Sequence, residues 1–217
     1  MALRGTFTLL CSLAVLSSAG AENETSLQNC TSQMQLLKRL SADLKGAVEC
    51  GEKLPSAWSP HETAALLQSI RIMTDTLHRH QLQECQGAEP TKCPEAEVPH
   101  GGGLVCVTIA NKRYCKPLCS HGYDFAFIRR SRLYDECSEQ TGYKWQTQYV
   151  GGNKLAVCNE APIQISGAKT AYFPKDQDCL TTKSSSQLQS GIMVEFTTEL
   201  KAEGVQGEPQ SACLVCG

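Results

Sequence analysis

The sequence lacks the motifs that most enzyme classes require. It has no Gly-x-Ser-x-Gly elbow, no phosphate-binding glycine loop and no pair of carboxylates in a recognisable catalytic frame. Metal-ligand spacing is also absent: His78 and His80 are two positions apart, so on a helix they point about 200° apart and cannot share an ion. We therefore expect a non-enzymatic protein with no catalytic residue, no metal site and no cofactor.

The chain has little excess charge and no long hydrophobic run. Its 20 Lys and Arg against 22 Asp and Glu leave a net charge of −2, and this balance provides no basic surface for nucleic acid or an anionic membrane. Its most apolar run, residues 7–15, is shorter than the roughly 20 residues that a spanning helix needs. We expect no nucleic-acid partner and no membrane span.

Residues 1–21 have the features of a secretory signal peptide. Arg4 precedes the apolar run, and Ala19-Gly20-Ala21 matches the A-x-A cleavage pattern. The last residues have neither the hydrophobic tail of a lipid-anchor signal nor a prenylation cysteine. We expect cleavage after Ala21 and secretion to the extracellular space without an anchor.

Cysteine is the residue that the sequence has in excess. Of 13 cysteines, Cys11 lies in the predicted signal peptide, so 12 remain in the mature chain. An even number of cysteines in an oxidising compartment indicates up to six disulfides. Asn23 and Asn29 begin sequons and are candidate glycosylation sites of a secreted protein. The second sequon contains Cys30, so an early bridge there would leave Asn29 unmodified.

Residues 22–86 are predicted to form an antiparallel helical hairpin. Apolar residues recur at spacings of three and four between Leu27 and Val48, which indicates an amphipathic helix. A capping box at 59–62, with proline at its second position, starts a second helix that extends to about residue 84. Antiparallel packing would place Cys30 opposite Cys85, so we expect a disulfide between them. The apolar stripes either form an internal core or bind a second copy or another partner.

Residues 93–158 hold six cysteines within 66 residues. The order of Cys93, Cys119 with Gly122-Tyr123 after it, Cys137, Trp145 and Cys158 resembles that of a complement control protein (sushi) module. The resemblance implies a small all-β module without a catalytic site. It also implies that Cys93 bonds to Cys137 and Cys119 to Cys158, with Trp145 in the small core between the bridges.

Cys106 and Cys115 depart from the sushi pattern. They bracket residues 107–114, which have strand-forming residues on both sides of Asn111-Lys112 and are predicted to form a hairpin. A bridge between the two cysteines would close this hairpin. Six cysteines permit 15 connectivities, so the sequence by itself does not select one.

Three arginines, Arg129, Arg130 and Arg132, form a basic cluster within the cysteine-rich module. Grouped guanidinium groups bind sulfate and carboxylate through paired hydrogen bonds, so one interpretation is a polyanion-binding site for a glycosaminoglycan. The other interpretation is a solvated loop whose arginines pair with Asp135 and Glu136.

Residues 159–217 are predicted to form a short β segment. We expect strands at 163–165, 171–173 and 192–198, and a serine-rich loop at 183–190. Cys50, Cys179, Cys213 and Cys216 remain without an assigned partner.

The sequence thus predicts an α+β protein: a helical hairpin, a sushi-like β module and a short β segment. The function expected is extracellular recognition or adhesion by a secreted binding protein, whose partner is an extracellular protein or a glycosaminoglycan. The alternative is a soluble signalling ligand that engages a receptor through its helical hairpin.

Overall fold

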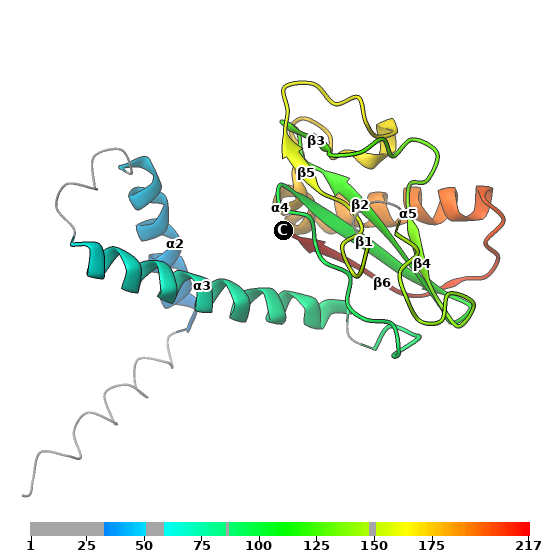
Figure 1. The fold of residues 1–217 in the computed structure, drawn as a ribbon, viewed down its shortest axis with the longest axis horizontal. Helices are drawn as coiled ribbons and strands as arrows, with labels where there is room; N and C mark the ends of the chain where they lie inside the picture. The colour runs from blue at the N-terminus through cyan, green and yellow to red at the C-terminus, as the bar shows by residue number, and fades with distance from the viewer. Residues whose placement is uncertain (1–32, 51–58, 86, 148–150) are drawn as a thin grey trace, which may run out of the picture. The chain divides into compact units, whose positions relative to one another are not determined.

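The structure is a computed structural model that describes residues 33–50, 59–85, 87–147 and 151–217. These residues form both helices and strands, in agreement with an α+β class (Figure 1). The chain divides into two compact units, Met1–Ser69 and Ile70–Gly217. The predicted signal peptide, Asn23, Asn29 and Cys30 lie outside the described residues.

The first unit contains helix α2 (Gln33–Glu49) and the start of helix α3 (Pro60–Leu82), which continues into the second unit. The predicted capping box begins α3: the Ser59 amide donates to the Glu62 carboxylate at 2.9 Å, and the Glu62 amide donates to the Ser59 hydroxyl at 3.2 Å. No residue of α3 is buried. The two helices are present as expected, and their antiparallel packing stays a prediction.

The second unit is built on a four-stranded antiparallel sheet in the order β4–β2–β1–β6. Its strands are β1 (Gly102–Ile109), β2 (Lys112–Cys119), β4 (Asp135–Cys137) and β6 (Pro209–Cys216). The hairpin predicted around Asn111-Lys112 is β1–β2, but its turn lies one residue earlier, because Lys112 already belongs to β2. Ala110 and Asn111 both have positive φ, 50° and 58°, as a two-residue type I′ turn requires. Strand β6 pairs with β1, so the sheet takes strands from both sides of residue 158.

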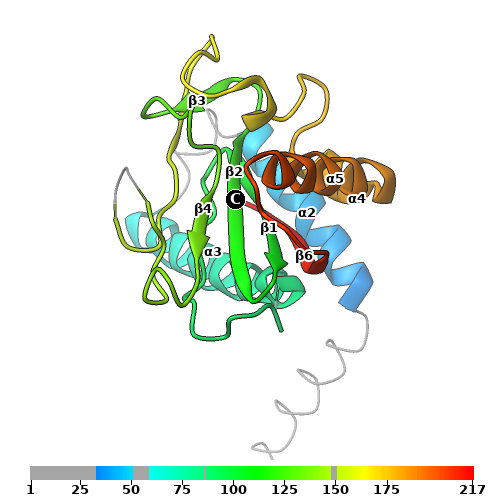
Figure 2. The same ribbon diagram turned by 90° about the vertical axis from the view of Figure 1, so that its right-hand side faces the viewer.

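Both faces of the sheet are covered, which explains why every residue of β1 is buried. One face packs against helix α5 (Ser186–Ala202), which lies beside the strands in Figure 2. Phe196 and Leu200 of α5 are buried there against Val105 and Val107. The opposite face holds Trp145 and most of the disulfide sulfurs. The side chains of the odd-numbered residues of β1 therefore face helix α5, and those of the even-numbered residues face the side that holds Trp145 and the disulfides.

The strand expected at 192–198 is wrong, because these residues belong to α5. The buried residues Phe196 and Leu200 are four positions apart, a helical spacing, whereas Val194 is exposed. The expected serine-rich loop is also wrong. It comprises the end of helix α4 (Cys179–Ser184), then the cap Ser185, whose hydroxyl accepts from the Leu188 amide, and then the start of α5.

A second, two-stranded sheet pairs β3 (Tyr123–Phe125) with β5 (Cys158–Glu160). The strands expected at 163–165 and 171–173 do not form. Residues 163–165 are irregular, and residues 169–171 are the 3₁₀ helix η2 (Lys169–Ala171). Tyr172 makes only a single bridge, to Cys119. Ile163 and Ile165 are both exposed side chains of an irregular segment, so their alternation does not mark a strand.

Five disulfides join described cysteines: Cys85–Cys213, Cys93–Cys137, Cys106–Cys115, Cys119–Cys158 and Cys179–Cys216. The predicted Cys30–Cys85 bridge is wrong, because Cys85 bonds to Cys213. Cys85 ends the 3₁₀ helix η1 (Gln83–Cys85), so this bridge fastens the segment after α3 to strand β6. Gln81 of α3 adds two hydrogen bonds to the backbone of Cys216, at 2.6 and 2.9 Å.

Candidate functional site

Two loops that leave the small sheet lie side by side and form a platform. We define the loop platform as residues 126–132, which follow β3, and residues 161–167, which follow β5. The Arg129 amide donates to the Ser166 carbonyl at 2.7 Å, and Arg129 also bridges to Gly167. The Arg130 guanidinium donates twice to the Ile165 carbonyl, at 3.0 and 2.7 Å. Backbone and side-chain bonds thus hold both loops in one arrangement.

The buried carboxylate of Asp124 organises the second loop from below. It accepts hydrogen bonds from the Ile165 amide at 3.1 Å, and from both the amide and the hydroxyl of Ser166. It also accepts from the Phe125 amide at 2.9 Å and from the Tyr172 hydroxyl. A carboxylate that accepts this many bonds fixes the backbone around it, because each donor is left unpaired if the carboxylate moves.

These bonds shift the pKa of both groups. Burial raises the pKa of Asp124, but the hydrogen bonds from Tyr172, Ile165, Ser166 and Phe125 favour the ionised form and bring the pKa below its ordinary value. The pKa of Tyr172 is raised to about 12 by burial and by its bond to Asp124. Asp124 is therefore ionised and Tyr172 protonated across the neutral range, as the bond between them requires.

Gly167 lets the platform approach the small sheet closely. A Cβ atom at this position would lie 2.7 Å from the Phe125 ring and 2.8 Å from the Tyr172 hydroxyl. Neither group is free to move, because Phe125 is buried and Tyr172 is bonded to Asp124. Glycine is therefore required here for packing.

A buried ion pair supports the first loop. Arg129 and Asp135 are 1% and 0% exposed, and their charged atoms lie 2.5 Å apart. Arg129 also donates to the Leu155 carbonyl at 2.9 Å. Asp135 belongs to β4 and is itself buried, so this pair anchors the loop to the main sheet. Arg132 approaches the other Asp135 oxygen at 3.4 Å.

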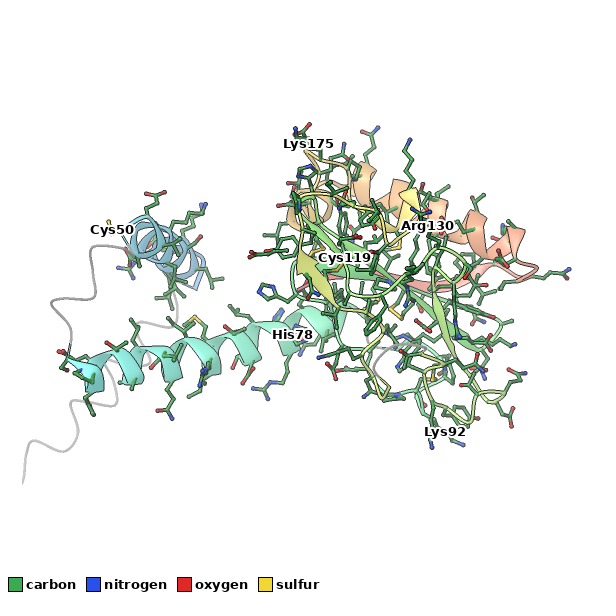
Figure 3. All side chains as sticks on the ribbon, turned by 45° about the horizontal axis from the view of Figure 1, so that its top comes forward. Cys50, His78, Lys92, Cys119, Arg130 and Lys175 are labelled. Atoms are coloured by element: carbon green, nitrogen blue, oxygen red, sulfur yellow. A yellow bond between two sulfur atoms is a disulfide. The ribbon has the colours of Figure 1, made fainter. Side chains whose placement is uncertain are left out.

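The predicted polyanion cluster is not assembled on the surface. Arg129 is buried, and Arg132 is paired with Asp135. Only Arg130 of the three has an exposed side chain whose bonds are to a carbonyl rather than to an acid (Figure 3). The pairing with Asp135 that the second interpretation predicted is present. Arg129, however, is in the interior and not in a solvated loop, because β4 and Leu155 enclose it.

The platform instead exposes large apolar side chains. Phe127 and Ile128 of the first loop are 52% and 75% exposed, and Ile163 and Ile165 of the second are 65% and 62% exposed. We call these four residues the apolar patch. Exposed apolar side chains gathered on neighbouring loops indicate an interaction surface, whereas single ones are ordinary. This patch was not predicted from the sequence, because the alternation of Ile163 and Ile165 indicated a strand; the Phe127-Ile128 pair beside arginines was the available signal.

A hollow of about 390 Å³ lies between β2, η2 and α5. Its most unusual residue is Lys116, which is 2% exposed and bonded to Glu199 of α5 at 2.5 Å. Burial lowers the pKa of Lys116, and the Glu199 carboxylate opposes that shift. This pair joins the sheet to the helix layer. Among the described residues, no three acidic, histidine or cysteine side chains are placed to hold a metal ion.

Two of the disulfides have the pairing that the sushi resemblance implies, Cys93–Cys137 and Cys119–Cys158. Trp145 packs with the first of these bridges, and its indole donates to the Pro94 carbonyl at 2.9 Å, whereas the second bridge belongs to a separate apolar cluster. No helix within the described ranges is long and apolar enough to cross a membrane. Comparisons of the chain with protein-family models, with curated proteins and with solved structures find no match.

Proposed function

We propose that this chain is a secreted, disulfide-rich, non-enzymatic protein that binds an extracellular protein through the apolar patch on its loop platform. The observation that carries the proposal is the exposure of Phe127, Ile128, Ile163 and Ile165 on loops that are held by fixed polar contacts. Apolar side chains presented on a rigid support are typical of the centre of a protein interface. The five disulfides support an oxidising, extracellular location.

The rigidity of the support favours binding. The Asp124 hydrogen bonds and the buried Arg129–Asp135 pair hold the loops in place before any partner arrives. A surface that is already ordered loses less conformational entropy on association, so more of the contact energy becomes affinity. The sushi resemblance supports the same proposal, because such modules serve in extracellular recognition.

A protein partner is preferred to a glycosaminoglycan. The buried Arg129 and the paired Arg132 leave Arg130 as the main cation of the platform. Heparin-like chains bind clusters of cations, and their binding is weakened by salt. We expect the secreted protein to elute from heparin below physiological ionic strength, and Arg130→Ala to change that elution little. Retention at physiological salt that Arg130→Ala abolishes would restore the glycosaminoglycan interpretation.

The test compares matched serine variants of exposed apolar residues. Secreted wild-type protein is used to capture extracellular proteins, and a captured protein is then purified and titrated against each variant. Ile128→Ser and Ile163→Ser should each weaken binding at least ten-fold. Leu180→Ser is the control, because Leu180 is 69% exposed on α4, outside the platform. Equal affinities of all three variants and wild type would overturn the proposal.

A further inference from the structure

Cys50 stands apart from every other cysteine that the structure describes. It follows the last residue of α2, is exposed, and has no disulfide (Figure 3). The other ten described cysteines are bonded to one another in the five bridges. Within one chain, a partner for Cys50 would therefore have to be Cys11 or Cys30. Cys11 belongs to the predicted signal peptide, which leaves Cys30.

Helix α2 keeps Cys30 and Cys50 of one chain apart. Cys30 precedes the first residue of the helix by three positions, and Cys50 follows its last residue. The 17-residue helix rises about 25 Å, and three residues of chain reach back at most about 11 Å. The two Cα atoms are thus at least about 14 Å apart while α2 is intact. A disulfide needs them within about 7 Å.

The same helix has an apolar face of which no side chain is fully buried in the described structure, although Leu40 is half-buried. Leu37 and Leu44 are seven positions apart and are 53% and 39% exposed. Leu40 and Ala47 each follow three positions later, which completes the alternation of three and four that two-stranded coiled coils use. No residue from 35 to 49 is buried. An isolated helix of this length is marginal in water and gains most of its stability by packing its apolar face.

These observations point to the same partner. Two identical helices with this spacing are complementary to one another, since the same residues form both sides of a two-fold interface. A second copy also brings a Cys50 of its own to the end of that interface. An unmatched cysteine in a secreted protein indicates pairing between chains. We propose that this chain forms a homodimer along α2 that is closed by a disulfide from Cys50 to a cysteine of the second copy.

The covalent step is a thiol–disulfide exchange in the secretory pathway. The Cys50 thiolate attacks an existing disulfide, such as oxidised glutathione, and one thiolate leaves. A cysteine thiolate of the second copy then attacks the mixed disulfide at Cys50 and expels the second small thiolate. Two protein thiols are oxidised to one disulfide, one small disulfide is reduced to two thiols, and two protons pass to the departing thiolates.

The dimer is tested by secreting two differently tagged copies of the full chain from the same cells. Capture of one tag under denaturing, non-reducing conditions should retain the other, and reduction should release it. Peptide mapping of the captured dimer should find Cys50 in a disulfide between chains. Cys50→Ser should lower the covalent dimer at least ten-fold, with little risk to folding because Cys50 is exposed.

The apolar face is tested with Cys50 in place. Leu37→Gln with Leu44→Gln should lower the covalent dimer at least three-fold, because the chains no longer align their cysteines. The matched control is Lys38→Gln with Lys45→Gln, which replaces the residue directly after each leucine. It should leave the amount of covalent dimer unchanged. Equal amounts of covalent dimer from the two double variants would overturn the proposed interface on α2.

Four results would overturn the covalent dimer itself. They are a monomer with a free or glutathione-capped Cys50, a Cys30–Cys50 disulfide within one chain, a disulfide from Cys50 to a different protein, and a dimer that persists in Cys50→Ser. None of these results bears on the apolar patch, so a failure of the dimer proposal can be distinguished from a failure of the proposed function.

Discussion

The Tyr172 hydroxyl donates a hydrogen bond to the Asp124 carboxylate, 48 residues earlier in the chain. Tyr172 also accepts from the Gly167 amide at 2.5 Å, so one phenol connects strand β3 to the end of the loop platform. The bond joins a buried carboxylate to a neutral donor, so removing the donor takes one of several hydrogen bonds away from a buried charge. The order of the apolar patch therefore depends on residues that lie beneath it.

Removing the Tyr172 hydroxyl should destabilise the protein without changing its surface. Tyr172→Phe deletes one donor to Asp124, and we expect a loss of about 1–3 kcal/mol in the free energy of unfolding. Tyr123→Phe is the control, because the Tyr123 hydroxyl has no hydrogen bond among those that the structure describes. Urea denaturation of both variants measures the difference. A loss of equal size in the control would show that the Asp124 bond contributes nothing specific.

The contribution of Asp124 to stability should disappear in acid. Its pKa in the folded protein lies below the ordinary carboxyl value of about 4. The stabilisation is thus fully present above that ordinary value and is lost as the pH falls through the folded pKa. Asp124→Asn should destabilise the protein at pH 7, and the difference from wild type should shrink as the pH is lowered. Unfolding free energies measured between pH 7 and pH 2 test this, and a constant difference would contradict it.

Breaking the buried Arg129–Asp135 pair should lower the free energy of unfolding more than breaking the partly exposed Arg132–Asp135 pair. Asp135→Ala leaves the Arg129 charge buried without its carboxylate, and we expect a loss of about 3–5 kcal/mol. Arg132→Gln removes a partly exposed partner at 3.4 Å and should cost less than about 1 kcal/mol. Thermal and urea unfolding compare the two variants. Similar losses would mean that Arg129 finds another partner or draws in water.

The Cys85–Cys213 bridge should stabilise the protein more than the Cys106–Cys115 bridge. The two pairs are separated by 128 and 9 residues along the chain. On the chain-entropy relation, these loops correspond to about 5 and about 3 kcal/mol. Replacing both cysteines of each pair by serine, and measuring unfolding in urea, gives the comparison. An equal loss from the shorter loop would mean that the contacts of the sulfurs, rather than the loop length, decide the stability.

Features that depend on neighbouring residues were predictable from the sequence. The Ser59–Glu62 capping box joins residues three positions apart and begins α3 where the pattern indicated. The β1–β2 hairpin turns at Ala110 and Asn111, and its strands are joined by Cys106 and Cys115 as neighbours in register. In each case the interacting groups are close in the chain, so their geometry follows from local spacing.

The α5 segment shows where local spacing was insufficient. Residues 192–198 alternate in a way that fits a strand, but their apolar residues also fit a helix. The choice depended on what covers the sheet: Phe196 and Leu200 pack against β1, a strand that lies some 90 positions earlier. A short apolar pattern is compatible with both periods, and only the contact with the sheet distinguishes them.

Local patterns in the chain were enough to predict the mixed helical and strand composition, the start of α3, the first hairpin and the chemistry of a disulfide-rich chain. The bond of Cys85 to Cys213 and the burial of Arg129 against Asp135 are visible only in the folded chain. The same holds for the exposure of Phe127, Ile128, Ile163 and Ile165. The physical reason is that burial and pairing depend on which distant segments share the sheet, and no local spacing contains that information.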